Sequence, residues 1–366
     1  MSLKCGIVGL PNVGKSMLFN AVSNNHVESE NFPFCTIEPN VGVVGVPDER
    51  MNVLAGLAHS QRILPTSIEF VDIAGLVRGA HQGEGLGNKF LGHIQSVHAI
   101  VHVVRCFDDP KIVHVAGQVD PVFDKEVINH ELLCKDIEML TKKCQKLEKL
   151  SKQQAKTYQQ EYDLAKYCLD RMLKAGQHAR DIKTDREQQH IVDSWQLLTA
   201  KPMIYFANVD ETTLLGGPNK HLEALRVSID QERSPLIVGC AALEQQLSTF
   251  SCQEKAIVLE EYHLYEPSLD QLIRSAYKAL SLITFFTVGP KETRAWTVPK
   301  GAKAPEAAGV IHSDFQRGFI KAEVIAFEDY QSFKGEAECK KAGKLRTEGK
   351  DYIVADGDIM LFRFNV

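Results

Sequence analysis

The sequence predicts an α/β protein in which helices cover a mostly parallel sheet. Short apolar, β-rich runs alternate with helical patterns, and this alternation is typical of parallel sheets. The chain has 366 residues, more than one hydrophobic core usually holds, so we expect two or three domains. The runs expected to form the main sheet are residues 3–9, 41–46, 67–72, 99–106, 202–208 and 235–240.

The composition is that of a globular protein, with 44% hydrophobic and 24% charged residues, which excludes a wholly disordered chain or a low-complexity fibre. No stretch approaches the roughly 18 apolar residues of a membrane span, so we expect no membrane partner. The N-terminal apolar run leads straight into a functional motif and is not interpreted as a signal peptide. Nine cysteines without a CxxC pair predict reduced thiols and a cytoplasmic location.

Residues 124–200 lack strand character and predict a helical insert. Apolar residues recur there at spacings of three and four, which places them on one side of a helix. Two such stripes, joined by polar residues 148–157, are typical of an antiparallel hairpin that projects as a coiled-coil arm. Ordinary core helices of the main domain are the alternative. The stripes are Leu133, Ile137, Leu140, Cys144 and Leu147, then Tyr158, Tyr162, Ala165, Leu169 and Met172.

Strand-like runs separated by glycine and proline turns return after residue 280, and a helical stretch precedes Val310. They predict a small α+β domain over residues 281–366. The main domain would then comprise residues 1–123 and 201–280. The strands expected in the C-terminal domain are 284–288, 295–298, 319–326, 352–354 and 359–364.

The net charge of −5 gives no overall signature of a nucleic-acid-binding protein. The charge is uneven, however, since residues 141–190 contain 12 Lys and Arg against 7 Asp and Glu. That stretch, with Lys142, Lys143, Lys146 and Lys149, is the best candidate for contact with an anionic partner such as RNA. A solvated helix face is the alternative. We expect a monomer, because no long exposed apolar segment requires covering.

Residues 9–16, GLPNVGKS, match the phosphate-loop pattern GxxxxGK[ST]. The pattern directly follows an apolar strand and opens a helix, which is the context it requires. Glycines let backbone N–H groups turn toward phosphates, and the helix N-terminus adds partial positive charge. Lys15 is expected to reach the terminal phosphates, and the Ser16 hydroxyl is expected to ligate magnesium.

A second element ends the strand at residues 67–72. Asp72 and Gly75 form a DxxG pattern, in which Asp72 would hold magnesium through water and the Gly75 N–H would bond the γ-phosphate. The loop before the second strand contains Thr36, which is expected to supply a further magnesium ligand. These positions predict a switch whose loops respond to loss of the γ-phosphate.

The third element, Asn208-Val209-Asp210-Glu211, stands where guanine-specific switch proteins have NKxD. Val209 replaces the lysine, Glu211 replaces the aspartate, and Asp210 comes one residue early and is expected to point elsewhere. A mismatched buried polar group costs about 1–3 kcal/mol, so the change argues against strict guanine specificity. A turn unrelated to the base is the alternative. Backbone N–H groups of Cys240 and Ala241 could also meet the base edge.

Leu76 occupies the position where many GTPases carry the glutamine that orients the attacking water. Leucine cannot orient water, so hydrolysis must be slow, use another group or depend on a partner. His81, in the glycine-rich stretch that follows, and the more distant His114 are candidate groups. Asn12 could instead coordinate a monovalent cation such as potassium. Two neighbours of His81, Arg78 and Gln82, could also swing in.

The sequence resembles the YchF subfamily of Obg-like P-loop ATPases from Lys4 to the C-terminus, most weakly in the helical insert. The motifs that carry the resemblance are GLPNVGKS, NFPFCTIEPN, FVDIAGLVRGAHQGEGLGNKFL, HVVRCF, NVDE, RAWTVPKGAKAPEAAGVIHSDFQRGFI and DYIVADGDIM. The resemblance implies a Ras-like nucleotide domain, a coiled-coil insert and a C-terminal TGS domain of β-grasp fold. It also implies a preference for ATP, agreeing with the altered NVDE element, and a hydrophobic residue at the position of Leu76.

Carried over by position, the resemblance implies a magnesium site at Ser16 and Thr36 and a base site at Asn208, Val209 and Glu211. It implies association with the ribosome, at the large subunit or the whole particle, and a role in translation or stress control. The surface between the β-grasp domain, the arm and the nucleotide domain would face RNA. Many members have threonine at the position of Met17. The implied phosphate-binding residues are Asn12, Val13, Gly14, Lys15, Ser16 and Met17.

The leading hypothesis is therefore a magnesium-dependent ATPase that acts as a switch on ribosomes. A GTPase of the ribosome-assembly type is the second, although Val209 and Glu211 speak against it. A ribosome or RNA adaptor with incidental hydrolysis is the third, and Leu76 keeps it open. A small-molecule kinase fits poorly, because the chain shows no evident acceptor-binding acid or basic lid.

Overall fold

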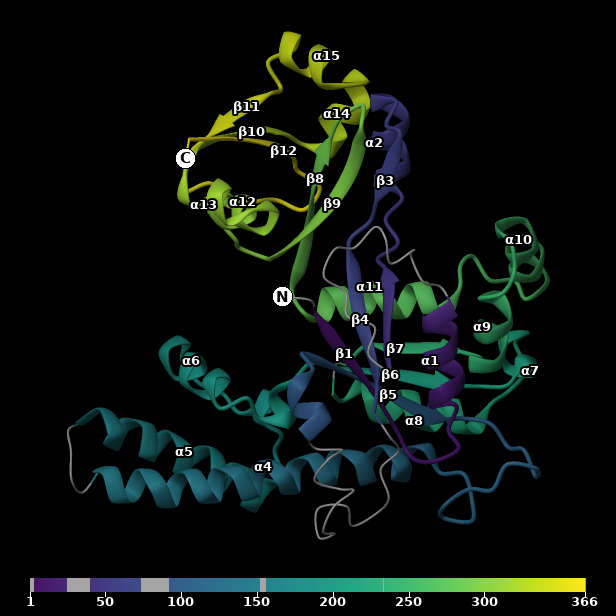
Figure 1. The fold of residues 1–366 in the computed structure, drawn as a ribbon. Helices are drawn as coiled ribbons and strands as arrows, with labels where there is room; N and C mark the ends of the chain where they lie inside the picture. The colour runs from purple at the N-terminus through teal and green to yellow at the C-terminus, as the bar shows by residue number, and fades with distance from the viewer. Residues whose placement is uncertain (1–2, 25–39, 74–91, 152–155, 233, 366) are drawn as a thin grey trace.

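The computed structural model describes residues 3–24, 40–73, 92–151, 156–232 and 234–365. Figure 1 shows a central sheet with helices on both sides, a long helical hairpin below it and a second sheet above it. The hairpin and the second sheet thus lie on different sides of the central domain. The expected α/β class and the projecting arm are both confirmed.

The central sheet has the order β2-β4-β1-β5-β6-β7, and only β2 runs antiparallel to its neighbour. All six strands fall within the runs predicted from the sequence. Because helices cover both faces, β5 and β6 are buried along their whole lengths. The strands are β1 (Lys4–Val8), β2 (Val41–Gly45), β4 (Ser67–Asp72), β5 (Ala99–Arg105), β6 (Met203–Asn208) and β7 (Leu236–Gly239). The helices are α1 (Lys15–Asn24), α7 (Glu211–Leu214), α8 (Lys220–Asp230), α9 (Ala241–Leu247), α10 (Cys252–Glu261) and α11 (Ser268–Ala279).

The arm consists of α4 (Pro121–Ser151) and α5 (Lys156–Ala175), and the shorter α6 (Arg186–Ser194) packs beside α5. The two predicted stripes meet between α4 and α5 and form a separate small core, closed by Trp195. The first turns of α4 belong instead to the main core, through Ile128 and Leu132. The boundary expected at residue 124 therefore falls inside one continuous helix. Two 3-10 turns, η2 (Ala179–Asp181) and η3 (Leu198–Ala200), lead the chain back to β6.

The C-terminal domain has a sheet of order β11-β10-β12-β8-β9-β3, with α12 packed against it. Residues 352–354, expected to form a strand, make only one isolated bridge, between Ile353 and Lys303. The short elements α14, α15 and β11 had no clear signal in the sequence. The elements are β8 (Leu282–Val288), β9 (Glu292–Pro299), α12 (Ala304–Ile311), α13 (Ser313–Arg317), β10 (Phe319–Ile325), α14 (Phe327–Phe333), α15 (Glu336–Lys341), β11 (Arg346–Glu348) and β12 (Ile359–Phe364).

Residues 50–64, assigned above to the main domain, are built into the C-terminal domain instead. They form α2 (Arg50–Ala58) and β3 (Arg62–Leu64), and β3 pairs in parallel with β9 at the edge of the second sheet. Met51 and Leu54 of α2 share a core with Phe286 of β8. Burial of these apolar side chains needs the second sheet, because the main sheet is already covered. The simple division at residues 123 and 281 is therefore wrong for this segment.

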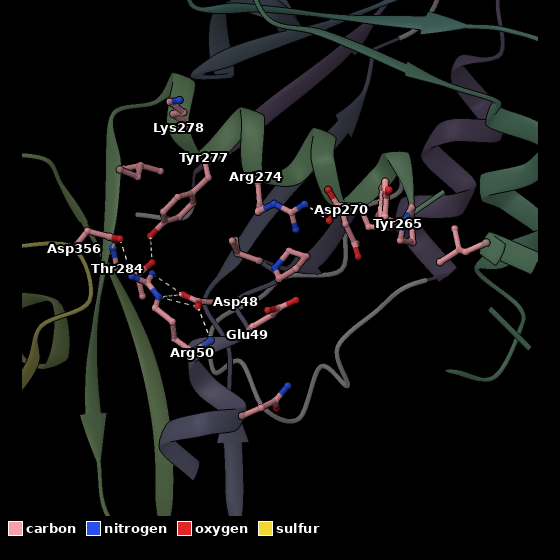
Figure 2. A pocket seen from close by; sticks show the side chains of 17 residues that line it. Asp48, Glu49, Arg50, Tyr265, Asp270, Arg274, Tyr277, Lys278, Thr284 and Asp356 are labelled. Atoms are coloured by element: carbon pink, nitrogen blue, oxygen red, sulfur yellow. Dashed lines mark hydrogen bonds and ion pairs between the residues drawn. The ribbon is translucent and has the colours of Figure 1, made fainter. Parts of the chain in front are cut away.

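The two domains meet around a cavity of about 880 Å³, shown in Figure 2. Arg50 forms a two-pronged contact with Asp48, with Nε–Oδ1 at 2.9 Å and Nη2–Oδ2 at 2.8 Å. Its Nη1 also donates to Asp356 of the C-terminal domain at 2.7 Å. From α11, the buried Tyr277 hydroxyl donates to the carbonyl of Ile283 at 3.0 Å. The main domain is thus tied to the C-terminal domain by Asp48, which precedes α2 and holds Arg50, and by Tyr277.

No helix within the described ranges is long and apolar enough to cross a membrane. Eight cysteines lie in these ranges and all are free thiols. Burial raises the pKa of the Cys5 thiol to about 12, so that thiol stays protonated and unreactive at neutral pH.

Candidate functional site

The GLPNVGKS loop joins β1 to α1, as the motif requires. Asn12 and Gly14 have positive φ angles of 61° and 100°, which curl the loop around its own backbone. A Cβ atom on Gly14 would lie 2.2 Å from Nδ2 of Asn208. Only glycine fits there, because both the backbone angle and the space exclude a side chain. Val13 is buried in the main core and fixes the middle of the loop.

Lys15 begins α1 and is buried, with only 8% of its surface exposed. Its ammonium donates a hydrogen bond to the carbonyl of Leu10 at 2.7 Å. Burial lowers the pKa of Lys15 to about 8, and the charge of Asp72 acts in the opposite direction. The ammonium is thus held inside the loop and lacks the full charge compensation that a phosphate would give.

Asp72 is the last residue of β4 and lies close enough to Lys15 for their charges to interact. Burial raises the pKa of its carboxyl group, and Lys15 lowers it. Within the described residues, its Oδ1 atom is buried without a hydrogen-bond partner. A buried oxygen without a partner costs free energy, so it suits a ligand that the protein receives from outside. Ser16 and Met17, in the first turn of α1, are exposed toward the solvent.

Several predicted site residues lie outside the described residues. They are Thr36, Gly75, Leu76 and His81, together with the alternatives Arg78 and Gln82. Their predicted roles stay predictions.

Asn208, at the end of β6, joins the phosphate loop to the turn between β7 and α9. Its Nδ2 donates to the carbonyl of Val13 at 2.8 Å, and its Oδ1 accepts from the N–H of Ala241 at 2.9 Å. All three groups are buried, so Asn208 acts as a clamp between two loops. The expectation that the Ala241 N–H meets the base is wrong in this structure, because Asn208 already occupies that donor. Cys240, the N-cap residue of α9, is buried beside it.

The other three residues of the NVDE element each have a different role. Val209 is 1% exposed and packs in the main core, so its side chain does not face open solvent where a base could lie. Asp210 caps α7, accepting from the Thr213 N–H at 2.9 Å, and this confirms that it points elsewhere. Glu211 is exposed at the start of α7 and accepts a hydrogen bond from the Tyr262 hydroxyl at 2.7 Å. That bond raises the pKa of Tyr262 to about 12.

His114 is not available as a catalytic base in this structure. Its Nε2 pairs with Oδ2 of the buried Asp124 at 2.8 Å, and its Nδ1 accepts from the N–H of Ala116 at 3.2 Å. Both ring nitrogens are therefore engaged, and we assign His114 a structural role. Asn12 uses its Nδ2 to hold the carbonyl of Val113 at 3.1 Å, which joins the phosphate loop to the same segment.

Arg105, at the end of β5, is a site-supporting residue that sequence reasoning missed. It is 1% exposed, and its guanidinium donates to the carbonyls of Phe107 and Ile112 at 3.0 Å each and to that of Asp109 at 3.3 Å. It thereby shapes the loop that Asn12 touches. The available signal was a charged residue closing an apolar strand, which predicts a buried charge with specific partners.

Comparisons with known proteins agree with this arrangement. A family model described as a 50S ribosome-binding GTPase matches residues 4–143. The YchF-GTPase C-terminal model, described as a protein of unknown function (DUF933), matches residues 282–365. The chain is 50% identical to the ribosome-binding ATPase YchF of Haemophilus ducreyi over 100% of both chains. This chain belongs to the YchF family.

Other YchF proteins support the same conclusion. The ribosome-binding ATPase YchF of Bacillus subtilis is 49% identical over 100% of both chains. The solved structure of the Schizosaccharomyces pombe YchF GTPase superposes with a TM-score of 0.91 at 38% identity, covering 99% of this chain and 98% of that one. The family and fold class implied by the sequence resemblance are thus confirmed. The bacterial proteins are named ATPases and the yeast protein a GTPase, so the names alone leave the base open.

Proposed function

We propose that this protein is a magnesium-dependent ATPase that binds ribosomes and modulates translation or the stress response. The observation that carries the choice of base is the NVDE element, in which Val209 is buried and Asp210 caps a helix. Val209 cannot supply the lysine of NKxD, Asp210 is turned away, and Glu211, at the aspartate position, accepts a hydrogen bond from Tyr262. The names of the bacterial relatives support both hydrolysis of ATP and ribosome binding. Such a partner would place the protein in the cytoplasm.

The side chains of the loop each have a task in this proposal. Lys15 would exchange its bond to Leu10 for the terminal phosphates, because an ammonium gains more from an anion than from a neutral carbonyl. The N–H groups of residues 12–17 would surround the phosphates at the start of α1. Asn208 would keep the phosphate loop and the base loop at a constant separation.

The residues present fit a magnesium ion. The Ser16 hydroxyl is exposed beside the loop, and Asp72 has a buried carboxylate oxygen without a partner in the described chain. Oxygen ligands of this kind, completed by phosphates and water, are the set that magnesium prefers. When bound, the ion would neutralise charge that develops on the phosphates. Thr36 as a further ligand and potassium at Asn12 are parts of the same proposal.

The test is equilibrium binding of fluorescent ATP and GTP analogues, with magnesium, to the wild type and to Glu211→Asp, which restores the aspartate of NKxD. We expect the wild type to favour ATP by about tenfold or more, equal to roughly 1.4 kcal/mol, and Glu211→Asp to move toward GTP. Glu223→Asp, an exposed acid in the first turn of α8, is the control. Equal binding, or a preference for GTP, would contradict the proposal.

A GTPase is the second candidate, favoured by the name of the yeast structure and by the family model that matches residues 4–143.

The third candidate is an adaptor in which nucleotide binding matters and hydrolysis is incidental. Cosedimentation with ribosomes distinguishes it from a switch. A switch should bind ribosomes with a different affinity in the presence of a non-hydrolysable ATP analogue than in the presence of ADP. Lys15→Ala should remove that difference. Nucleotide-independent binding would favour a simple adaptor.

A further inference from the structure

We propose that a groove in the C-terminal sheet, between β8 and β12, binds an extended segment of a partner protein that has an apolar centre and basic ends. The two strands run parallel but pair at a single position, Ile359 with Phe286. Along its other edge β12 pairs with β10 over its whole length. Beyond residue 286 the two strands therefore border a gap in the sheet. Figure 1 shows these strands in the upper domain, away from the arm.

The gap is a groove of about 380 Å³, within the range of roughly 300–1,000 Å³ typical of binding pockets. Eleven of its lining residues are apolar, and several are aromatic. Leu361 of β12 is 45% exposed and Phe364 is 38% exposed, so the apolar surface is open to solvent. Phe315 of α13 stacks on Phe364 with ring centroids 3.9 Å apart, which gives the groove a rigid wall. Trp296 forms another part of the lining.

The charge at the groove argues for a basic protein segment. Its charged lining residues are three glutamates, and no lysine or arginine lines it. Glu323 is compensated by Arg363 at 3.1 Å and by Lys321 at 3.8 Å. Glu292 and Glu336 are exposed and form no ion pair within the described part of the chain. A groove with uncompensated carboxylates repels a phosphate backbone and attracts lysine or arginine.

An extended segment suits the shape as well as the charge. Partner segments commonly add to a sheet as a further strand, with side chains that fill pockets along the edge. Here the apolar side chains would lie on Leu361 and Trp296, and the basic ends would reach Glu292 and Glu336. The proposal concerns a surface remote from the nucleotide site, so it stands independently of which nucleotide the main domain prefers.

The fluorescence of Trp296 can report binding directly. The chain has two tryptophans, and Trp195→Phe leaves Trp296 alone. The probe is a short synthetic peptide with an apolar centre and an arginine at each end, added to the full-length Trp195→Phe protein. We expect a saturable change in Trp296 emission. A peptide with glutamate ends and one with a serine centre should each bind about tenfold more weakly. The affinity should also fall with added salt.

Leu361→Lys, and separately Glu292→Lys with Glu336→Lys, should each weaken binding of the basic peptide by about tenfold. Ile320→Lys is the matched control, because Ile320 is 56% exposed on β10 but does not line the groove. Unchanged thermal unfolding of each variant shows that it is folded. Tighter binding of a single-stranded RNA than of the basic peptide would overturn the proposal. So would self-association of the wild type that Leu361→Lys abolishes, or equal binding of all three peptides.

Discussion

The main domain joins the arm and the C-terminal domain in two different ways. At the arm, the polar groups are buried: Lys125 of α4 is 1% exposed and pairs with Glu232 and Ser228, while the Tyr205 hydroxyl also donates to Glu232. Nearby, Asp136 is fully buried and accepts hydrogen bonds from Leu198 and Thr199. At the C-terminal domain, the Arg50 cluster borders a wide cavity and is partly exposed.

The two junctions differ in how firmly they hold each appendage. Removing one partner of a buried ion pair leaves a charge without compensation and is strongly destabilising, whereas exposed pairs contribute little. The arm therefore belongs energetically to the main domain. The C-terminal domain is held by the Arg50 ion pairs, which salt can screen, by the buried Tyr277 hydrogen bond and by the insertion of residues 50–64 into its core. On denaturation, we expect the junction with the C-terminal domain to open before the junction with the arm.

The largest effect is expected for Lys125→Met. The change leaves the Glu232 carboxylate with the Tyr205 hydroxyl and with Arg180 at 3.8 Å. Breaking a buried pair costs roughly 3–5 kcal/mol, and we expect about 3 kcal/mol because Glu232 keeps some exposure. Urea unfolding measures this loss. Adding Glu232→Gln should restore part of the stability, and no restoration would show that the charge is not the cause.

Lys15 is a second buried lysine, and it differs from Lys125 because its hydrogen bond goes to a neutral carbonyl. Its pKa is lowered to about 8 in the folded protein, so the unfolded chain binds more protons between pH 8 and the ordinary lysine pKa of about 10.5. The stability of the wild type should therefore rise across this pH window, relative to Lys15→Met, by about 3 kcal/mol. Unfolding of both proteins without nucleotide measures this. A constant difference between them would contradict the burial argument.

Arg50→Met should cost less, about 1 kcal/mol, because the ion pairs that it removes are partly exposed. The loss should shrink at about 1 M salt, where the Debye length is roughly 3 Å. Unfolding at low and high salt, with Lys125→Met run in parallel, gives the comparison. An Arg50→Met effect as large and as insensitive to salt as that of Lys125→Met would remove the distinction between the junctions.

The smallest effect is expected for Lys142→Met on the outer surface of the arm. Lys142 pairs with Glu138 one turn earlier, and its side chain is 73% exposed. Pairs of this kind contribute about 0.3–0.5 kcal/mol. Thermal unfolding should therefore barely change. A loss comparable to that of Lys125→Met would mean that surface pairs, and not the buried network, hold the arm.

Local sequence patterns predict the main sheet, the arm and the phosphate loop. The strands β5 and β6 were predictable because strands buried on both faces are continuous apolar runs, and the other four strands of the main sheet also fall within predicted β-rich runs. The two arm helices followed from spacings of three and four, and the glycines and lysine of GLPNVGKS could be assigned because their roles depend on local backbone geometry.

Other features depend on contacts between distant segments, which local patterns do not reveal. Arg105 and His114 became structural because their partners lie across a loop whose path no local pattern reveals. Asn208 became a clamp because it bridges residues 13 and 241, and Ala241 thereby lost its free N–H. Residues 50–64 joined the C-terminal domain because β3 pairs with β9 there and α2 buries Met51 and Leu54 beside Phe286. Local pattern specifies an element, but the surface on which it packs depends on which apolar surfaces are not yet covered by other elements.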